Sequence, residues 1–333
     1  MVLAGGLALK HSLFKNYTFV DYATQVYSAL VGLAILLFHN ETVPRWQCLV
    51  LAHAAGLLLV HWMVQANSRA ERDKLLDFFR HFYPVLFYIW FFAETGWLNR
   101  MLFDTYFDPV IIRLDQALFG CQPSLLWMVK LPYPGISEVF YAAYFSYYLM
   151  IGGVGLALYL RNKQHFFHYV SVVSFVFYVC YIIYIVVPVI GPPVFFHKSY
   201  GVSLPPELQN LATQAYYPDA VQRGVFFRLM GWIYKGFEAP GAAIPSSHIA
   251  IALCTVFFSF RYLPRARYPH LFAAVLLCLS TVYCRYHYLV DVLAGIITAA
   301  VLVPLGNWLY FKSAPEMSGK ALEKPPAIHS QQI

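Results

Sequence analysis

Two histidines in the last third of the chain stand among residues that could carry out group transfer. Residues 244–248 read Ile-Pro-Ser-Ser-His, and residues 284–291 read Cys-Arg-Tyr-His-Tyr-Leu-Val-Asp. An unperturbed imidazole has a pKa of about 6.5, so His248 and His287 can each give or take a proton near neutral pH. Two apolar stretches of helical length separate them, and two crossings return the chain to its starting side. We therefore expect the two side chains to meet.

The neighbours of His287 indicate how it would act. Asp291 follows four positions later, so on a helix the two share one face and the carboxylate can hold one imidazole N–H. The other ring nitrogen is then free to act as a nucleophile. Arg285 supplies a cation beside them, and His248 remains to protonate a leaving oxygen. These groups suffice for phosphoryl transfer without a metal.

Ser246 and Ser247 stand where a helix is expected to begin, since proline suits a first turn and serine is a common N-cap. The amides of a helix N-terminus also form a ready anion site. The serines are therefore either helix caps or ligands of a phosphate group.

The pattern Pro-Ser-Ser-His at 245–248, followed by His287 and Asp291, resembles the type-2 phosphatidic acid phosphatase superfamily. Within it, residues 285–295 look most similar to the branch that contains inositol phosphorylceramide synthase and bacterial membrane lipid phosphatases. Residues 108–120, with Asp108-Pro109, Leu114-Asp115 and Leu118-Phe119-Gly120, and residues 188–193 resemble the same branch. The likeness covers roughly 100–310.

This resemblance implies that His287 forms a phosphohistidine, that Asp291 orients it and that His248 is the general acid. It also implies that Ser246 and the amides near Ser247 bind phosphate oxygens. Two arginine motifs of the superfamily have no counterpart, because Gly191-Pro192-Pro193 lacks the arginine and Ser280-Thr281 replaces Ser-Arg. The cation would come from Arg285, alone or with a basic residue of the segment 191–243, namely Lys198, Arg223, Arg228 or Lys235.

Composition indicates the setting of this site. Of the 333 residues, 60% are hydrophobic and only 12% are charged, whereas a soluble domain is about one quarter charged. A bilayer core about 30 Å thick needs roughly 20 apolar residues per helical span. The sequence predicts an all-α, polytopic transmembrane helical bundle of about six to eight spans. Candidate spans cover 22–38, 46–65, 80–98, 136–160, 168–190, 245–261, 269–285 and 288–311.

We divide the chain into N-terminal membrane spans at 1–98, a catalytic membrane domain at 99–312 and a disordered tail at 313–333. Within the second part, 99–135 reads as an amphipathic stretch and 191–243 as a polar loop. The net charge of +7 arises from short basic clusters between spans, which argues for orientation in a membrane and against nucleic acid as a partner. The clusters at 161–165 and 261–267 place the site on the periplasmic or exoplasmic side.

We expect neither a cofactor nor a metal, because the six cysteines form no CxxC pair and His53 and His61 lie eight residues apart in one span. Tyr141, Tyr144, Tyr147 and Tyr148 are expected to serve helix packing, with substrate lining as the alternative.

The most consistent function is a membrane phosphatase that acts on a lipid or polyisoprenoid phosphate. A phosphotransferase that passes the phospho-headgroup to a lipid alcohol would use the same motifs. A non-enzymatic membrane protein on this fold is a third possibility, but it would be expected to have lost His248 or His287. The oligomeric state stays open.

Overall fold

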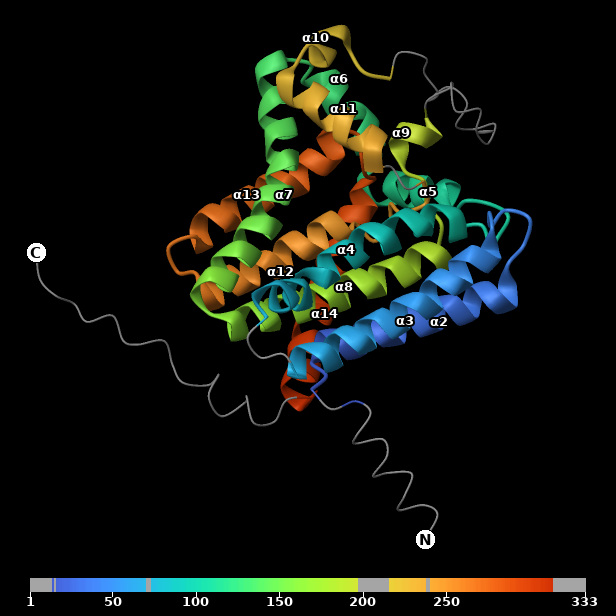
Figure 1. The fold of residues 1–333 in the computed structure, drawn as a ribbon. Coiled ribbons are helices and arrows are strands. Elements are labelled where there is room, and N and C mark those ends of the chain that lie inside the picture. Colours follow the sequence, from blue (N-terminus) through green and yellow to red (C-terminus); the bar gives the residue numbers. More distant parts are fainter. Residues whose placement is uncertain (1–13, 15, 70–72, 197–215, 238–239, 314–333) are drawn as a thin grey trace, which may run out of the picture.

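The computed structural model describes residues 14, 16–69, 73–196, 216–237 and 240–313. Within these ranges every regular element is a helix, and the only isolated backbone bridge pairs Val189 with Ala242. The helices are α2 (Phe19–Phe38), α3 (Trp46–Arg69), α4 (Lys74–Leu98), α5 (Asp108–Phe119), α6 (Pro123–Lys130), α7 (Pro134–Arg161), α8 (Lys163–Val186), α9 (Pro192–Phe195), α10 (Asp219–Gln222), α11 (Val225–Phe237), α12 (Ser247–Tyr262), α13 (Arg267–Tyr283) and α14 (Leu289–Ser313). The predicted all-helical bundle is confirmed (Figure 1).

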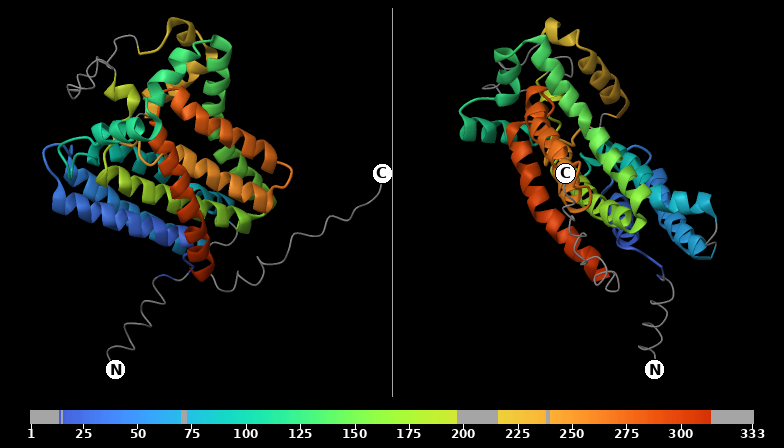
Figure 2. Two further views of the ribbon diagram at one scale, coloured as in Figure 1. Left: turned by 180° about the vertical axis from the view of Figure 1, so that it is seen from behind. Right: turned by 90° about the vertical axis from the view of Figure 1, so that its left-hand side faces the viewer.

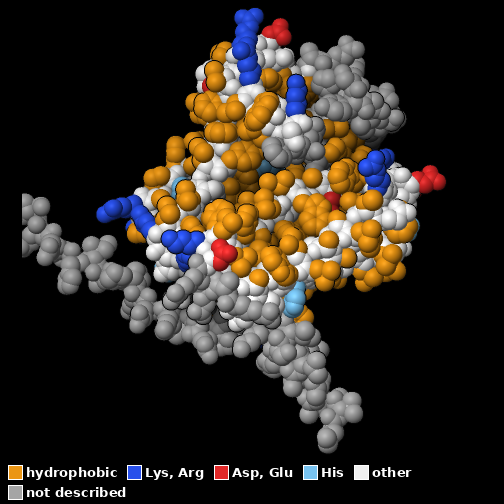
Figure 3. Space-filling model, viewed as in Figure 1, with side chains coloured by type: hydrophobic (Ala, Val, Ile, Leu, Met, Phe, Trp, Pro, Cys, Tyr) orange, Lys and Arg blue, Asp and Glu red, His pale blue; other side chains and the backbone are white. Residues whose placement is uncertain are grey.

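The eight predicted spans coincide with α2, α3, α4, α7, α8, α12, α13 and α14. Among the described residues, five helices are long and apolar enough to cross a membrane, namely α2, α3, α7, α8 and α14. The outer surface agrees with this setting, because Leu58 and Leu160 are 72% and 73% exposed. One whole face is covered mainly by hydrophobic side chains (Figure 3). The protein is therefore an integral membrane protein.

Helix α8 is the centre of the bundle. Its most apolar stretch is 72% buried inside the protein, against 33% to 44% for the other four long apolar helices. It packs against α2, α4, α7, α12 and α14, so the N-terminal helices and the C-terminal helices share one core (Figures 1 and 2). Because α8 faces protein on most sides, its outward side chains do not need to suit lipid.

The connections contain more helix than the sequence predicts. The stretch 99–135 forms α5 and α6, and the predicted polar loop 191–243 contains α9, α10 and α11. Helix α11 forms because its aromatic residues find partners in α7, as in the edge-on contact of Phe227 with Tyr141 at 5.2 Å between ring centroids. Tertiary packing thus stabilises helices in a segment that was predicted to be a polar loop. Of the predicted disordered tail 313–333, Ser313 is the last residue of α14, and 314–333 lie outside the described residues.

Helix α5 has clear sequence limits. Pro109 occupies its first turn, where the missing N–H costs nothing, and Gly120 ends it at a φ of 67° in the left-handed region. Its buried face carries Asp108, Ile111, Ile112 and Asp115. Two carboxylates on the buried face of a short helix need partners, and these partners lie at the candidate site.

Candidate active site

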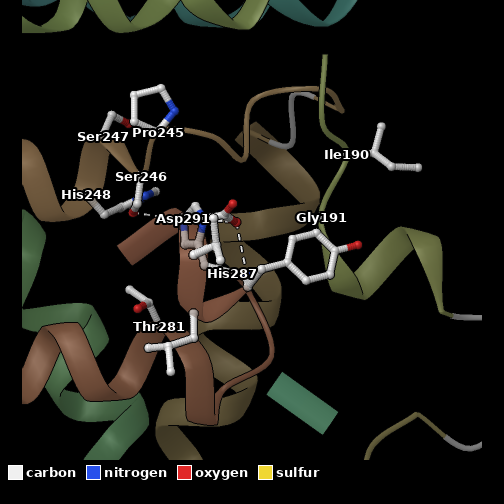
Figure 4. A network of polar contacts seen from close by, with 12 residues as sticks. Ile190, Gly191, Pro245, Ser246, Ser247, His248, Thr281, His287 and Asp291 are labelled. Atoms are coloured by element: carbon white, nitrogen blue, oxygen red, sulfur yellow. Dashed lines mark hydrogen bonds and ion pairs between the residues drawn. The ribbon is translucent and has the colours of Figure 1, made fainter. Parts of the chain in front are cut away.

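The two predicted motifs lie at the start of α12 and between the end of α13 and the start of α14, beside the end of α8, and Figure 4 shows residues of both motifs close together. His248 lies in the first turn of α12, whereas His287 lies between the end of α13 and the start of α14. In α8, the Tyr184 hydroxyl donates to the Pro245 carbonyl at 3.0 Å. The ring centroids of His248 and His287 are 5.8 Å apart. The two side chains therefore meet, as the two helical crossings predicted.

His287 is held in a turn between the predicted spans 269–285 and 288–311, and not on the helix for which its spacing to Asp291 was considered. Helix α14 begins only at Leu289, and the His287 amide donates to the Thr281 carbonyl at 3.1 Å. The expected contact with Asp291 nevertheless forms, with 3.3 Å between His287 Nδ1 and Asp291 Oδ2. The same carboxylate oxygen accepts the Tyr288 amide at 3.0 Å, so Asp291 fixes the turn as well as the ring.

Ser246 faces His287 and does not cap α12. It occupies the N-cap position, but within the described chain its side chain makes no capping hydrogen bond. Its Oγ lies 3.2 Å from His287 Nε2, the ring nitrogen opposite the one that contacts Asp291. Its amide donates to the Asp291 carbonyl at 3.1 Å. The three residues thus form one buried polar group.

Burial sets the charge of this group. His287 is 4% exposed and Asp291 is fully buried, whereas His248 is half-buried. Burial lowers the pKa of His287 to about 4, against a smaller opposing effect of the Ala243 carbonyl. The ring is therefore neutral at physiological pH, and a neutral imidazole is the form that can act as a nucleophile.

Two of the predicted phosphate ligands, Arg285 and Ser247, contact other groups of the protein. The Arg285 guanidinium donates to the carbonyls of Tyr216 and Leu125 and lies 4.7 Å from the centroid of the Tyr216 ring. Arg285 has a φ of 64°, in the left-handed region that side chains rarely adopt. Among the described residues it forms no ion pair with Asp291. The Ser247 amide donates to the Tyr184 hydroxyl at 3.1 Å.

The other basic residues that were predicted as possible phosphate ligands are, where the structure describes them, on the surface. Arg223, Arg228 and Lys235 are exposed, on or beside α10 and α11, and Lys198 lies outside the described residues. Among the residues that the structure covers, no cluster of His, Cys, Asp and Glu could hold a metal ion.

Helix α5 contacts the start of α14 and the segment 190–191, and no role was predicted for it from the sequence. The Asp115 carboxylate accepts the amides of Leu289 and Val290 at 3.1 and 2.8 Å, so it caps α14 immediately before Asp291. Capping by a carboxylate satisfies the free amides and suits the positive end of the helix.

Asp108 lies about two turns before Asp115 on the same face of α5 and binds a further segment. Its carboxylate accepts the amides of Ile190 and Gly191, both at 2.9 Å, and the hydroxyl of Tyr288 at 2.8 Å. Burial raises the pKa of Asp108 to about 6, against the opposing effect of these donors. The segment that it binds pairs in turn with the strand-like residues before Ser246, since the Ala243 amide donates to the Val189 carbonyl at 2.9 Å. The seven-residue spacing of two aspartates on one helix face was the available signal.

Gly295 allows α14 to approach the start of α12. A Cβ at this position would lie 2.7 Å from the Ser246 carbonyl oxygen and 2.9 Å from Ile249 Cβ. Only a residue without a side chain permits this contact.

Comparison with known proteins gives one family. The family model described as the PAP2 superfamily matches residues 109–305, which begin in α5 and end in α14 and include both histidine motifs. No curated protein and no solved structure matches the chain significantly. Because the match spans more than half of the 333 residues, the chain belongs to the PAP2 superfamily.

Proposed function

We propose that this protein is a membrane phosphatase that hydrolyses a lipid or polyisoprenoid phosphate through a phosphohistidine on His287. Membership of the PAP2 superfamily supports phosphatase-type phosphoryl transfer in general. The observation that carries the finer proposal is the contact chain Asp291–His287–Ser246 with His248 beside it, because it supplies an oriented nucleophile and a separate proton donor.

The reaction follows from these positions. His287 Nε2 attacks phosphorus while Asp291 Oδ2 holds the proton on Nδ1, and the bond from phosphorus to the lipid oxygen breaks. His248 gives a proton to that leaving oxygen. Water then attacks the phosphohistidine, His248 takes a proton from it, and the bond between nitrogen and phosphorus breaks. Inorganic phosphate leaves, and both histidines return to their starting states.

The apolar surroundings favour a lipid as the substrate. The site lies at the ends of helices that are long and apolar enough for a bilayer, so a headgroup phosphate would reach it from the membrane surface. Arg285 would need to leave its carbonyl partners to bind phosphate; otherwise Ser246 and the basic residues of the segment 191–243 would carry that role.

Two variants test the roles of the histidines. His287→Ala removes the atom that accepts the phosphoryl group, so turnover should be lost for lipid and aryl phosphates alike. His248→Ala removes only the proton donor, a loss of about 10²- to 10⁴-fold that matters most for a basic leaving group, so an aryl phosphate should recover much of its rate. Rescue of His287→Ala by the better leaving group, or wild-type rates in both variants, would overturn the assignment.

The acceptor is tested by substrate dependence. A phosphatase should release inorganic phosphate from one lipid phosphate alone in detergent micelles. Strict dependence on an added diacylglycerol, ceramide or other lipid alcohol would replace water by an alcohol and make the protein a phosphotransferase.

We also propose that the site faces the periplasmic or exoplasmic side. Helix α12 runs from Ser247 to Tyr262, so the basic segment 261–267 lies at the helix end away from the site. In a Cys48→Ser background, an impermeant thiol reagent on intact cells should label Gln222→Cys and spare Arg265→Cys. The opposite labelling would reverse the orientation.

A further inference from the structure

His248 has a hydrogen-bond partner to which the proposed reaction gives no role. The Tyr144 hydroxyl of α7 lies 3.2 Å from His248 Nε2, and it also lies 3.0 Å from the Tyr234 hydroxyl of α11. His248 Nδ1 is buried and has no hydrogen-bond partner among the described residues. One ring nitrogen thus contacts Tyr144, and the other has no hydrogen-bond partner within the described residues.

We propose that Tyr144 is a positioning residue that fixes the tautomer of His248 and that Tyr234 holds Tyr144 in place. This inference rests on the proposed function. The Tyr144 oxygen accepts a hydrogen bond from the Nε2–H group of His248, and the Tyr144 hydroxyl donates a hydrogen bond to the Tyr234 oxygen. His248 Nδ1 is then the nitrogen that exchanges a proton with the reacting oxygen.

This assignment balances the protons over the whole reaction. In the first step the His248 imidazolium gives its Nδ1 proton to the lipid oxygen as the bond between that oxygen and phosphorus breaks. The neutral ring keeps its Nε2 proton, which stays hydrogen-bonded to the Tyr144 oxygen. In the second step the free pair on Nδ1 takes a proton from the attacking water as the bond between His287 and phosphorus breaks. The contact between Nε2 and Tyr144 persists throughout, so the ring need not turn over between steps.

Contacts of α11 set the position of Tyr234. The Glu138 carboxylate of α7 accepts the amides of Val225 and Phe226 at 2.9 and 3.0 Å, which fixes the first turn of α11. The Tyr234 ring stacks on Tyr286, with 4.1 Å between centroids and 11° between planes. Tyr286 directly precedes His287, and Tyr144 contacts His248, so Tyr234 is linked to both histidines through these two tyrosines.

A purely structural role for these tyrosines is the competing explanation, since a buried hydroxyl is normally paired. It predicts that removal of the Tyr144 hydroxyl lowers stability and that any loss of turnover is the same for every substrate. The positioning role instead predicts an effect that depends on the leaving group and disappears when His248 is absent.

The test begins with Tyr144→Phe, which keeps the ring and removes the hydroxyl. We expect kcat on a lipid phosphate to fall about 10- to 100-fold with KM unchanged, and kcat on an aryl phosphate to fall less than about threefold. Tyr234→Phe should change kcat in the same direction by a smaller factor, and it serves as the second variant if Tyr144→Phe does not fold. Tyr141→Phe is the matched control, because this hydroxyl lies on the same helix, is buried and has no hydrogen-bond partner in the described chain.

A double-mutant cycle with His248→Ala completes the test. Tyr144→Phe should cause no further loss of lipid-phosphate turnover in that background. An equal loss in both backgrounds, or wild-type kcat for Tyr144→Phe beside a leaving-group-dependent loss in His248→Ala, would overturn the inference alone. A wild-type rate in His248→Ala itself would overturn the proposed function and the inference with it.

Discussion

Removal of the cap that Asp115 places on α14 should lower both the stability and the turnover of the protein. In Asp115→Asn one oxygen remains to accept an amide, but an NH₂ group replaces the other oxygen and faces a backbone N–H. A hydrogen bond to a charged group is worth about 1.5–3 kcal/mol, and the remaining bond weakens as the charge disappears. The side chain is fully buried, so water cannot replace the lost bond. We expect the free energy of unfolding to fall by about 2–4 kcal/mol, which is a factor of about 30 to 900 in the unfolding equilibrium.

The assay is the apparent unfolding midpoint in detergent micelles together with turnover of an aryl phosphate. For a chain of 333 residues this loss corresponds to roughly 3–6 °C on the scale for soluble proteins. Turnover should fall at least about tenfold, because the displaced start of α14 carries Asp291 away from His287. Asp104→Asn is the matched control, since Asp104 is exposed and the substitution changes the charge equally. A midpoint and a turnover equal to those of Asp104→Asn would refute the role of α5.

Four further predictions concern His287, Gly295, Ser246 and the absence of a metal requirement. Because burial lowers the pKa of His287 to about 4, about nine-tenths of the rings are neutral at pH 5, against about 3% for an unshifted imidazole, so kcat/KM should stay high down to about pH 5; a falling limb centred near pH 6.5 would contradict this. Gly295→Ala places a Cβ 2.7 Å from the Ser246 carbonyl, so turnover should be largely lost, whereas Gly152→Ala, with nothing within 4 Å, should match wild type. Ser246→Ala should lower kcat about tenfold and leave the unfolding midpoint unchanged, since its hydroxyl contacts His287 and does not cap α12; a lower midpoint with normal kcat would restore the capping role. Turnover should persist in EDTA, and a loss on chelation that divalent metal restores would require a metal in the reaction.

The predictable part of the site is the part whose signals are local or follow from the topology. His287 and Asp291 are four residues apart, and the return of His248 to the same side needs only two helical crossings. The helical class and the eight candidate spans depend on apolar length, which any chain in lipid must provide.

The unpredicted parts depend on contacts between distant segments. Asp115 meets Leu289 across 174 residues and Asp108 meets Tyr288 across 180, and no single-sequence pattern gives such partners. Helix α11 was missed because its stability comes from aromatic contacts with α7 rather than from its own propensity. Arg285 was placed by proximity in sequence, but its left-handed backbone accompanies a guanidinium bound to the carbonyls of Tyr216 and Leu125.

The most direct test of the phosphohistidine on His287 is to trap it. Wild-type protein and the variants His248→Ala and His287→Ala would be mixed with an aryl phosphate, quenched under alkaline conditions that preserve phosphohistidine, digested and sequenced by mass spectrometry. The account predicts a phosphoryl group on His287 in the wild type, a larger fraction in His248→Ala because the water-activating base is missing, and none in His287→Ala. A phosphoryl group on His248, or turnover in His287→Ala without any labelled histidine, would contradict it.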